Sequence, residues 1–236
     1  MNPVRLRLTV KRYSVRLRLT VKQRDEREIM VYGYHIVLPH YGFWLPNDPR
    51  GSWSEFVGCW EIARFGESTR HLEQRTLAML TPEELALREA ARQALLYPPV
   101  SLTGKQALSV ANGFKEQSSK SDYAIWACSI LPEHTHLVIA RHRYKAEQIA
   151  NLLKGAATAR LIDDGIHPLR QYAKPDKRPP GMWARHQWIS YLDSDQAIEN
   201  AINYVIENPI KEGKPMQNWK WITPYAGLDP GWTTLN

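Results

Sequence analysis

The sequence has few cysteines and no long apolar run, and each of these absences narrows the class of protein. Its 236 residues include two cysteines, Cys59 and Cys128, which are too few for a disulfide framework and lack the spacing of a metal site. No apolar run approaches the roughly 20 residues of a membrane-spanning helix, so we expect no membrane partner. The first residues are basic, but the apolar stretch of a secretory signal does not follow them. We therefore expect a cytoplasmic protein.

Acidic residues are fewer than basic ones, and the excess of basic residues is unevenly distributed. The net charge is +7, and residues 1–30 hold nine Lys or Arg against three Asp or Glu. A second basic region, residues 141–188, holds ten Lys or Arg against four acidic residues. Such a region is either a solvated face or a surface for nucleic acid, and composition alone leaves both open.

The first thirty residues contain a perfect repeat, because "VRLRLTVK" occurs at 4–11 and again at 15–22. Each copy alternates apolar and polar residues as a strand does, so the two could pair as a basic hairpin. A short duplication that the protein does not need explains the repeat equally simply. We expect residues 1–29 to be a dispensable extension. Residues 30–236 then form one domain, with an insertion around 47–100 and an aromatic C-terminal tail.

The rest of the chain shows an alternation of predicted strands and helices. Period-2 patterns predict the strands, and capping residues with period-3.6 patterns predict the helices. In chain order we expect a strand at 30–38, helices at 81–96 and 103–117, strands at 122–131 and 134–142, a helix at 146–162, a strand at 183–192, and a helix from an N-cap at Asp193 to Asn208. This order predicts an α+β fold of the ferredoxin-like split β-α-β kind. We expect an antiparallel sheet of about four to five strands, with the helices packed mainly on one face.

Two pairs of polar residues stand out against this pattern. His134 and His136 lie two apart on a predicted strand, so their imidazoles point to the same side of the sheet. Tyr204 and Asn208 lie four apart on the last predicted helix, at the edge of its apolar stripe. The histidines are either a pair of metal ligands or two partly exposed side chains without a shared function. Asn208 is either a site residue or a cap beside Pro209, and Tyr204 is either a site residue or a boundary aromatic.

The segments "PEHTHLVIA" (132–140) and "YVIENPIKEG" (204–213) together resemble the HUH single-tyrosine transposases, in particular the REP-associated tyrosine transposases. In that family a His-hydrophobe-His strand is followed by a helix with a lysine, here "LLKGAATARLI", and later by a Tyr-x-x-x-Asn-Pro helix. The opening "YHIVLPHYGFWLPNDPRG" also resembles the family's first strand and loop. The resemblance covers about residues 30–222 and is best at 123–213. Thr135 stands where the family prefers a large apolar residue.

The resemblance implies a site and a reaction. Tyr204 would be the nucleophile, and His134, His136 and Asn208 would bind a divalent metal ion, Mg²⁺ or Mn²⁺. The fold would be of the HUH endonuclease type. The reaction would be cleavage and rejoining of single-stranded DNA through a 5′-phosphotyrosine. The substrate would be single-stranded or hairpin-forming repeat DNA, handled by a monomer or a homodimer associated with the bacterial nucleoid when bound.

Basic residues near the two motifs are candidates for contacts with DNA phosphates. The candidates are Arg141, Arg143, Lys154, Arg160 and Arg185. Trp183, Trp188, Trp219 and Trp221 either stack on bases or pack in the core.

Two alternatives remain from the residues themselves. One is a DNA-binding protein on the same scaffold without catalysis. The other is a histidine-triad phosphoesterase, which Val138 disfavours because that motif needs a further histidine at this position.

Overall fold

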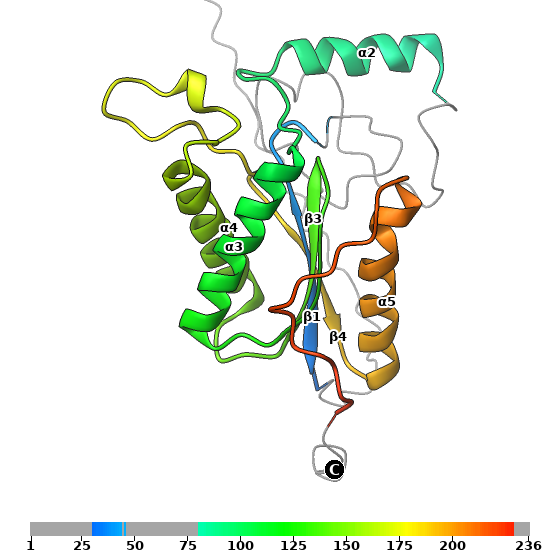
Figure 1. The fold of residues 1–236 in the computed structure, drawn as a ribbon. Coiled ribbons are helices and arrows are strands. Elements are labelled where there is room, and N and C mark those ends of the chain that lie inside the picture. The colour runs from blue at the N-terminus through cyan, green and yellow to red at the C-terminus, as the bar shows by residue number, and fades with distance from the viewer. Residues whose placement is uncertain (1–29, 44, 46–79, 229–236) are drawn as a thin grey trace, which may run out of the picture.

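The computed structural model describes residues 30–43, 45 and 80–228 (Figure 1). The predicted extension 1–29, residues 44 and 46–79, which include the first part of the predicted insertion around 47–100, and the last residues 229–236 lie outside the described part. The described residues form an α+β fold with one antiparallel sheet, which confirms the predicted fold class. Over these residues, no helix is both long and apolar enough to cross a bilayer.

Four strands form the sheet, and every neighbouring pair is antiparallel. In chain order they are β1 (Gly33–Pro39), β2 (Ile125–Ile130), β3 (His134–Ala140) and β4 (Trp188–Leu192), and the order across the sheet is β2-β3-β1-β4. This is the order of the predicted split β-α-β arrangement. The two central strands β1 and β3 pair with Pro39 opposite His134 and Gly33 opposite Ala140. The register therefore sets the end of β1 beside the beginning of β3.

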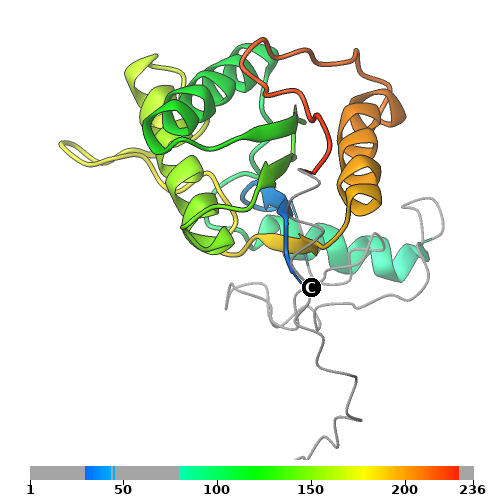
Figure 2. The ribbon, with the colours of Figure 1, turned by 90° about the horizontal axis from the view of Figure 1, so that it is seen from below.

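Helices cover both faces of the sheet. Helices α3 (Gly104–Ser121) and α4 (Ala146–Asp163) pack against each other on one face, and α5 (Asp195–Lys211) packs on the other face against β2 and β3. Figures 1 and 2 show α5 across the sheet from α3 and α4. Helix α2 (Pro82–Gln93) and a short 3-10 helix (Arg170–Tyr172) complete the described elements.

The strands direct alternate side chains into two separate cores. Ile36, Leu137 and Ile139 are fully buried against α3 and α4. Val138 points to the opposite face and packs with Val205 of α5 in a second, smaller core. Burial of each such aliphatic side chain stabilises the fold by about 1.5–3 kcal/mol. On β3, Leu137 and Ile139 therefore point into the larger core together with Thr135, while His134, His136 and Val138 point to the face that α5 covers.

Two predicted helix starts are confirmed by their caps. The side chain of Thr81 accepts a hydrogen bond from the backbone N–H of Glu84, and the Glu84 carboxylate accepts one from the N–H of Thr81. Thr103 and Gln106 form the same capping box at the start of α3. Each cap satisfies backbone donors that a helix leaves unpaired in its first turn.

The boundaries of α5 differ from the prediction. Its N-cap is Ser194 rather than Asp193, because the Ser194 hydroxyl accepts the hydrogen bond from the N–H of Ala197. The helix also continues through Pro209 to Lys211, although proline normally ends a helix. Pro209 is buried, and its carbonyl accepts hydrogen bonds from the N–H groups of Glu212 and Lys214. Asn208 is therefore a residue of the helix and does not cap a following turn.

The chain after α5 returns along the free edge of β2. The Gln217 side chain donates to the Ile130 carbonyl at 2.7 Å and accepts from the Ile130 N–H at 2.8 Å. The Trp219 indole donates to the carbonyl of Cys128, and the N–H of Thr223 donates to the carbonyl of Ile125. Figure 2 shows this segment running from α5 past the sheet. The tail thus occupies hydrogen-bonding groups that an exposed edge strand would offer to another chain.

Candidate active site

The two histidines of β3 lie on the face of the sheet that α5 covers. His134 and His136 are both buried, and their ring centroids are 4.8 Å apart. Val138 follows on the same face and is fully buried against α5. A third histidine of a histidine triad would have to stand at this position, so the structure agrees with the sequence in disfavouring that class.

Helix α5 brings Tyr204 against this histidine pair. The Tyr204 ring centroid lies 5.5 Å from that of His136, and 44% of the tyrosine remains exposed. Ile198, Ala201 and Val205 form the buried stripe of the helix, so the tyrosine lies at its border, as the helical periodicity predicts. The Tyr204 ring is therefore held beside the histidines and remains partly exposed.

Asn208 lies one turn beyond Tyr204 on the same side of α5. It is 7% exposed, and its amide nitrogen is buried without a hydrogen-bond partner. Glu212 follows at the C-cap, where a carboxylate oxygen lies 3.8 Å from Nε2 of His134. Tyr204 and Glu212, about two helical turns apart, both lie beside the two histidines, and Asn208 lies on the turn between them.

A third histidine belongs to the same cluster and was not singled out from the sequence. Nε2 of His35, on β1, lies 3.1 Å from Nδ1 of His136, and the two rings are stacked. The His35 ring is also 5.8 Å from that of Tyr204 and 5.7 Å from that of Trp188. The alternation of the first strand holds a signal for this residue: Tyr34 and Ile36 point into the larger core, which directs His35 to the other face.

Two further side chains border the cluster. The Phe43 ring stacks on His134 with a centroid distance of 4.8 Å. The Lys211 ammonium lies 5.3 Å from the centre of the Tyr204 ring and is 3.0 Å from the Glu207 carboxylate. A cation therefore lies over the Tyr204 ring, paired with a carboxylate on the same helix.

Burial sets the protonation state of the two inner histidines. Desolvation lowers the pKa of His136 well below its ordinary value, and the neighbouring imidazoles of His134 and His35 lower it further. Desolvation also lowers the pKa of His35 to about 4. Both rings are neutral at neutral pH, and each neutral imidazole keeps one nitrogen lone pair that can accept a proton or bind a metal ion.

The side chains of this cluster can bind a divalent ion if the Asn208 amide joins the two histidines of β3 as a ligand. The described residues contain no group of three or more His, Cys, Asp or Glu side chains arranged to hold a metal ion. Nε2 of His136 and the amide nitrogen of Asn208 are both buried without a hydrogen-bond partner. Turning the Asn208 amide over would place its oxygen where the nitrogen lies, since the two atoms are exchanged by this rotation. Two imidazoles and one amide oxygen would then form an incomplete shell that phosphate oxygens can complete.

Lys154, a predicted contact to DNA, lies on the opposite side of the sheet from the histidines. It is buried on α4, and its ammonium donates to the carbonyl of Ala184 and to the Gln187 side chain. Burial lowers its pKa to about 8. The lysine therefore ties α4 to the segment that leads into β4.

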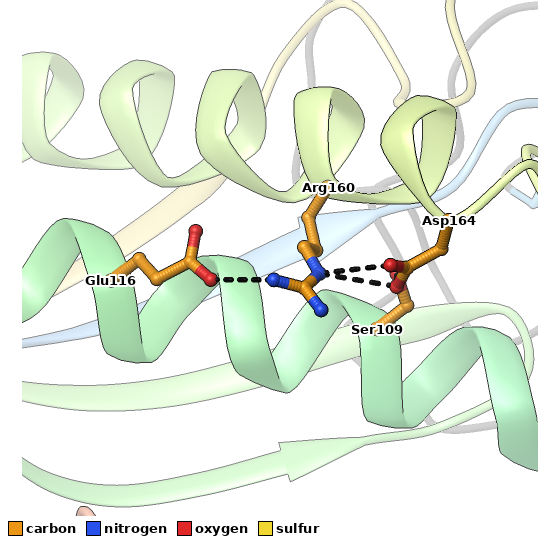
Figure 3. Close-up of polar contacts among 4 residues, drawn as sticks. All are labelled: Ser109, Glu116, Arg160 and Asp164. Atoms are coloured by element: carbon orange, nitrogen blue, oxygen red, sulfur yellow. Dashed lines mark hydrogen bonds and ion pairs between the residues drawn. The ribbon is translucent and has the colours of Figure 1, made fainter.

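Arg160, another predicted contact, links α3 to α4 (Figure 3). Its guanidinium is 2.9 Å from the Glu116 carboxylate and 3.1 Å from that of Asp164, which also accepts from Ser109. The hydrogen bond from Ser109, followed by that from Arg160, lowers the pKa of Asp164. Any contact of Arg160 with a DNA phosphate would compete with these two carboxylates.

The other three predicted DNA contacts are exposed, but they lie at two ends of the sheet. Arg141 follows the end of β3, about 17 Å along the strand direction from His136, and Arg143 lies two residues farther on. Arg185 precedes β4 and follows Ala184, whose N–H donates to the carbonyl of Pro39, the partner of His134 in the sheet. Arg185 is therefore at the histidine end.

The tryptophans serve mainly in packing. The Trp183 indole donates to the backbone of Lys154 and to Thr158, and Trp219 and Trp221 pack against the larger core. Trp188 is half-buried beside His35. Of the two roles left open by the sequence, packing accounts for the contacts of Trp183, Trp219 and Trp221.

Comparisons with known proteins add two solved structures. One is a REP-associated tyrosine transposase bound to a REP hairpin, at 11% identity and a TM-score of 0.40, covering 81% of this chain and 75% of that chain. The other is a candidate transposase from Deinococcus radiodurans R1, at 9% identity and a TM-score of 0.38, covering 82% of this chain and 98% of that chain. Both are described as transposases. No protein-family model and no curated protein sequence matches the chain. Because neither TM-score reaches 0.5, the functional assignment rests on the residues of the site.

Proposed function

We propose that the protein cleaves and rejoins single-stranded DNA in a transposase-like reaction, with Tyr204 as the nucleophile. The observation that carries this proposal is the half-exposed phenol of Tyr204 beside two buried histidines of the central strand. The site brings together a phenol, two same-face imidazoles and a buried amide. They suit attack on a phosphodiester whose charge needs compensation.

The reaction divides strand exchange into two balanced steps. The Tyr204 oxygen attacks the phosphorus, the bond from phosphorus to the 3′ oxygen breaks, and that oxygen leaves as a 3′-hydroxyl after taking a proton. The DNA then remains attached to Tyr204 through a 5′-phosphotyrosine. Attack by another 3′-hydroxyl reverses the chemistry and releases the tyrosine, so no external energy source is required.

The residues around Tyr204 have separate roles in this proposal. His134, His136 and Asn208 would hold a divalent ion, Mg²⁺ or Mn²⁺, and when bound such an ion supplies Lewis-acid polarisation of the scissile phosphate. Lys211 would offset negative charge close to the tyrosine. The exposure of Tyr204 lets an unpaired strand approach the hydroxyl in line, which a paired strand would hinder.

The proposed substrate is hairpin-forming repeat DNA with a single-stranded flank, as the resemblance of the two motifs implies. Arg185 would contact a phosphate at the histidine end of the sheet. Arg141 and Arg143 would contact DNA farther along β3. Lys154 and Arg160 remain predicted contacts, and in the folded chain each is engaged by other residues.

The test is covalent capture of DNA. A labelled single-stranded oligonucleotide that carries a hairpin and its flank is incubated with the protein and Mn²⁺ and resolved on a denaturing gel. The wild-type protein should give a band shifted by the mass of the chain. Tyr204→Phe removes one oxygen from a half-exposed ring, so it should abolish this band and leave DNA binding intact.

Tyr191→Phe provides the matched control, because Tyr191 is also an exposed tyrosine and packs edge-on against Tyr34, outside the histidine cluster. It should form the adduct as the wild type does. An adduct that persists in Tyr204→Phe would remove the tyrosine from its proposed role. If the wild-type protein binds hairpin DNA but never forms an adduct, the function is binding without catalysis.

A further inference from the structure

We infer that His35 is a positioning residue that fixes the tautomer of His136, so that the Nε2 lone pair of His136 is available to a divalent ion. This inference rests on the proposed metal site and adds to it a residue that neither motif contains. It follows from the 3.1 Å contact between Nε2 of His35 and Nδ1 of His136.

The contact requires one shared proton. Both rings are buried and carry a single N–H in the neutral form, so one nitrogen of the pair donates and the other accepts. If His136 donates from Nδ1, its Nε2 carries a lone pair. If His35 donates instead, Nε2 of His136 must carry a hydrogen. The choice between these two states decides whether His136 can bind a metal ion.

The surroundings of His136 favour donation from its Nδ1. Nε2 of His136 is buried and has no hydrogen-bond partner, so a hydrogen there would be a buried donor without an acceptor. An unsatisfied buried donor of this kind destabilises the folded state. A bound cation would use the lone pair of the other tautomer and remove that penalty. Metal-binding histidines usually donate their second N–H to a neighbouring acceptor in this way.

The fold keeps His35 in place. It lies on the central strand β1, next to β3, and its ring packs edge-on against Trp188 on one side while it stacks with His136. The adjacent residues Tyr34 and Ile36 are buried in the larger core, so the strand cannot rotate without exposing them. His35 is therefore held rigidly enough to orient the imidazole of His136.

The first test uses the metal-free wild-type protein and needs no variant. Nitrogen-15 NMR correlation of the imidazole side chains distinguishes a protonated from an unprotonated ring nitrogen. We expect His136 to be protonated at Nδ1 and unprotonated at Nε2. The opposite tautomer would overturn the inference, whatever the activity of the protein.

The second test measures Mn²⁺ binding by titration calorimetry and electron spin resonance. His35→Phe keeps a ring but removes the acceptor, and it should weaken Mn²⁺ binding by about 10–100-fold, the usual effect of losing such an outer partner. His35→Gln restores an acceptor near the position of Nε2 and should recover most of the affinity. Trp188→Phe alters the packing around His35 without touching the hydrogen bond, and it should bind Mn²⁺ as the wild type does.

The outcomes separate this inference from the proposed function. If the wild-type protein binds Mn²⁺ and forms the DNA adduct while His35→Phe binds Mn²⁺ equally well, His35 has no positioning role and the proposed function stands. If the wild-type protein binds no Mn²⁺ and forms no adduct, both fail together.

Discussion

The stability of the protein should depend on pH through His40, which lies one residue after β1 and anchors the turn before His134. His40 is fully buried, its Nδ1–H donates to the carbonyl of Pro132 at 2.9 Å, and its ring packs edge-on against Trp183. Desolvation lowers its pKa from 6.5 to about 4, although the hydrogen bond to Pro132 opposes this shift. The neutral ring is therefore part of the native structure.

The sign and size of the effect follow from the two pKa values. Between about pH 4 and 6.5 the unfolded chain binds a proton at this histidine and the folded chain does not, so the free energy of unfolding falls as the pH falls. The contribution is complete above pH 6.5 and is lost progressively below it. At about 1.4 kcal/mol per pKa unit, the full effect is about 3 kcal/mol, and about 2 kcal/mol is lost by pH 5.

Urea unfolding of the wild type and of His40→Asn at about pH 7.5 and about pH 5 measures this contribution. The asparagine amide can still donate to Pro132 but does not titrate in this range. Its smaller side chain should lower stability at both pH values. The wild type should lose about 2 kcal/mol more than the variant between them, because the other buried histidines titrate in both proteins. Equal losses in the two proteins would refute the reasoning.

Three further predictions concern packing, the sheet edge and DNA binding. Gly113→Ala should lower the free energy of unfolding by about 1–3 kcal/mol, because an added Cβ would lie 2.7 Å from Cα of Ala157. In the control Gly155→Ala the added Cβ meets no atom within 4 Å, so this change should raise helix stability by up to ~1 kcal/mol. Gln217→Ala removes both hydrogen bonds to Ile130, and sedimentation should detect new self-association if the tail shields the edge of β2. Unchanged sedimentation would contradict that role. Arg185→Ala should reduce the slope of the logarithm of DNA affinity against the logarithm of salt concentration by about 1. Arg160→Ala should chiefly lower the free energy of unfolding, because Glu116 and Asp164 lose their ion-pair partner. The reverse pattern would make Arg160 the phosphate contact.

The fold was predictable because apolar residues alternate regularly along β3, a central strand of the sheet. Leu137 and Ile139 alternate with His136 and Val138, and this alternation alone assigns the two histidines to one face. The end of α5 was not predictable. The general effect of proline on helices placed the end at Asn208, whereas the buried contacts of Pro209 and its carbonyl hydrogen bonds extend the helix to Lys211.

The site residues that belong to a motif with a fixed spacing could be predicted from the sequence, whereas those that occur singly could not. Tyr204 and Asn208 share a side of the helix because of their four-residue spacing, and a sequence displays that spacing directly. His35 is a single histidine in an aromatic strand, and its role depends on the pairing of β1 with β3, which no local pattern encodes. The burial of Lys154 likewise depends on Ala184 and Gln187, thirty or more residues away.

The most direct test of the central claim is to identify the residue that carries the DNA. The covalent complex is trapped with Mn²⁺, trimmed with nuclease, digested with protease and analysed by tandem mass spectrometry. We expect a nucleotide attached through its 5′ phosphate to the peptide that contains Tyr204, and a free 3′-hydroxyl on the released strand. Attachment at any other residue, or linkage through a 3′ phosphate, would contradict the central claim.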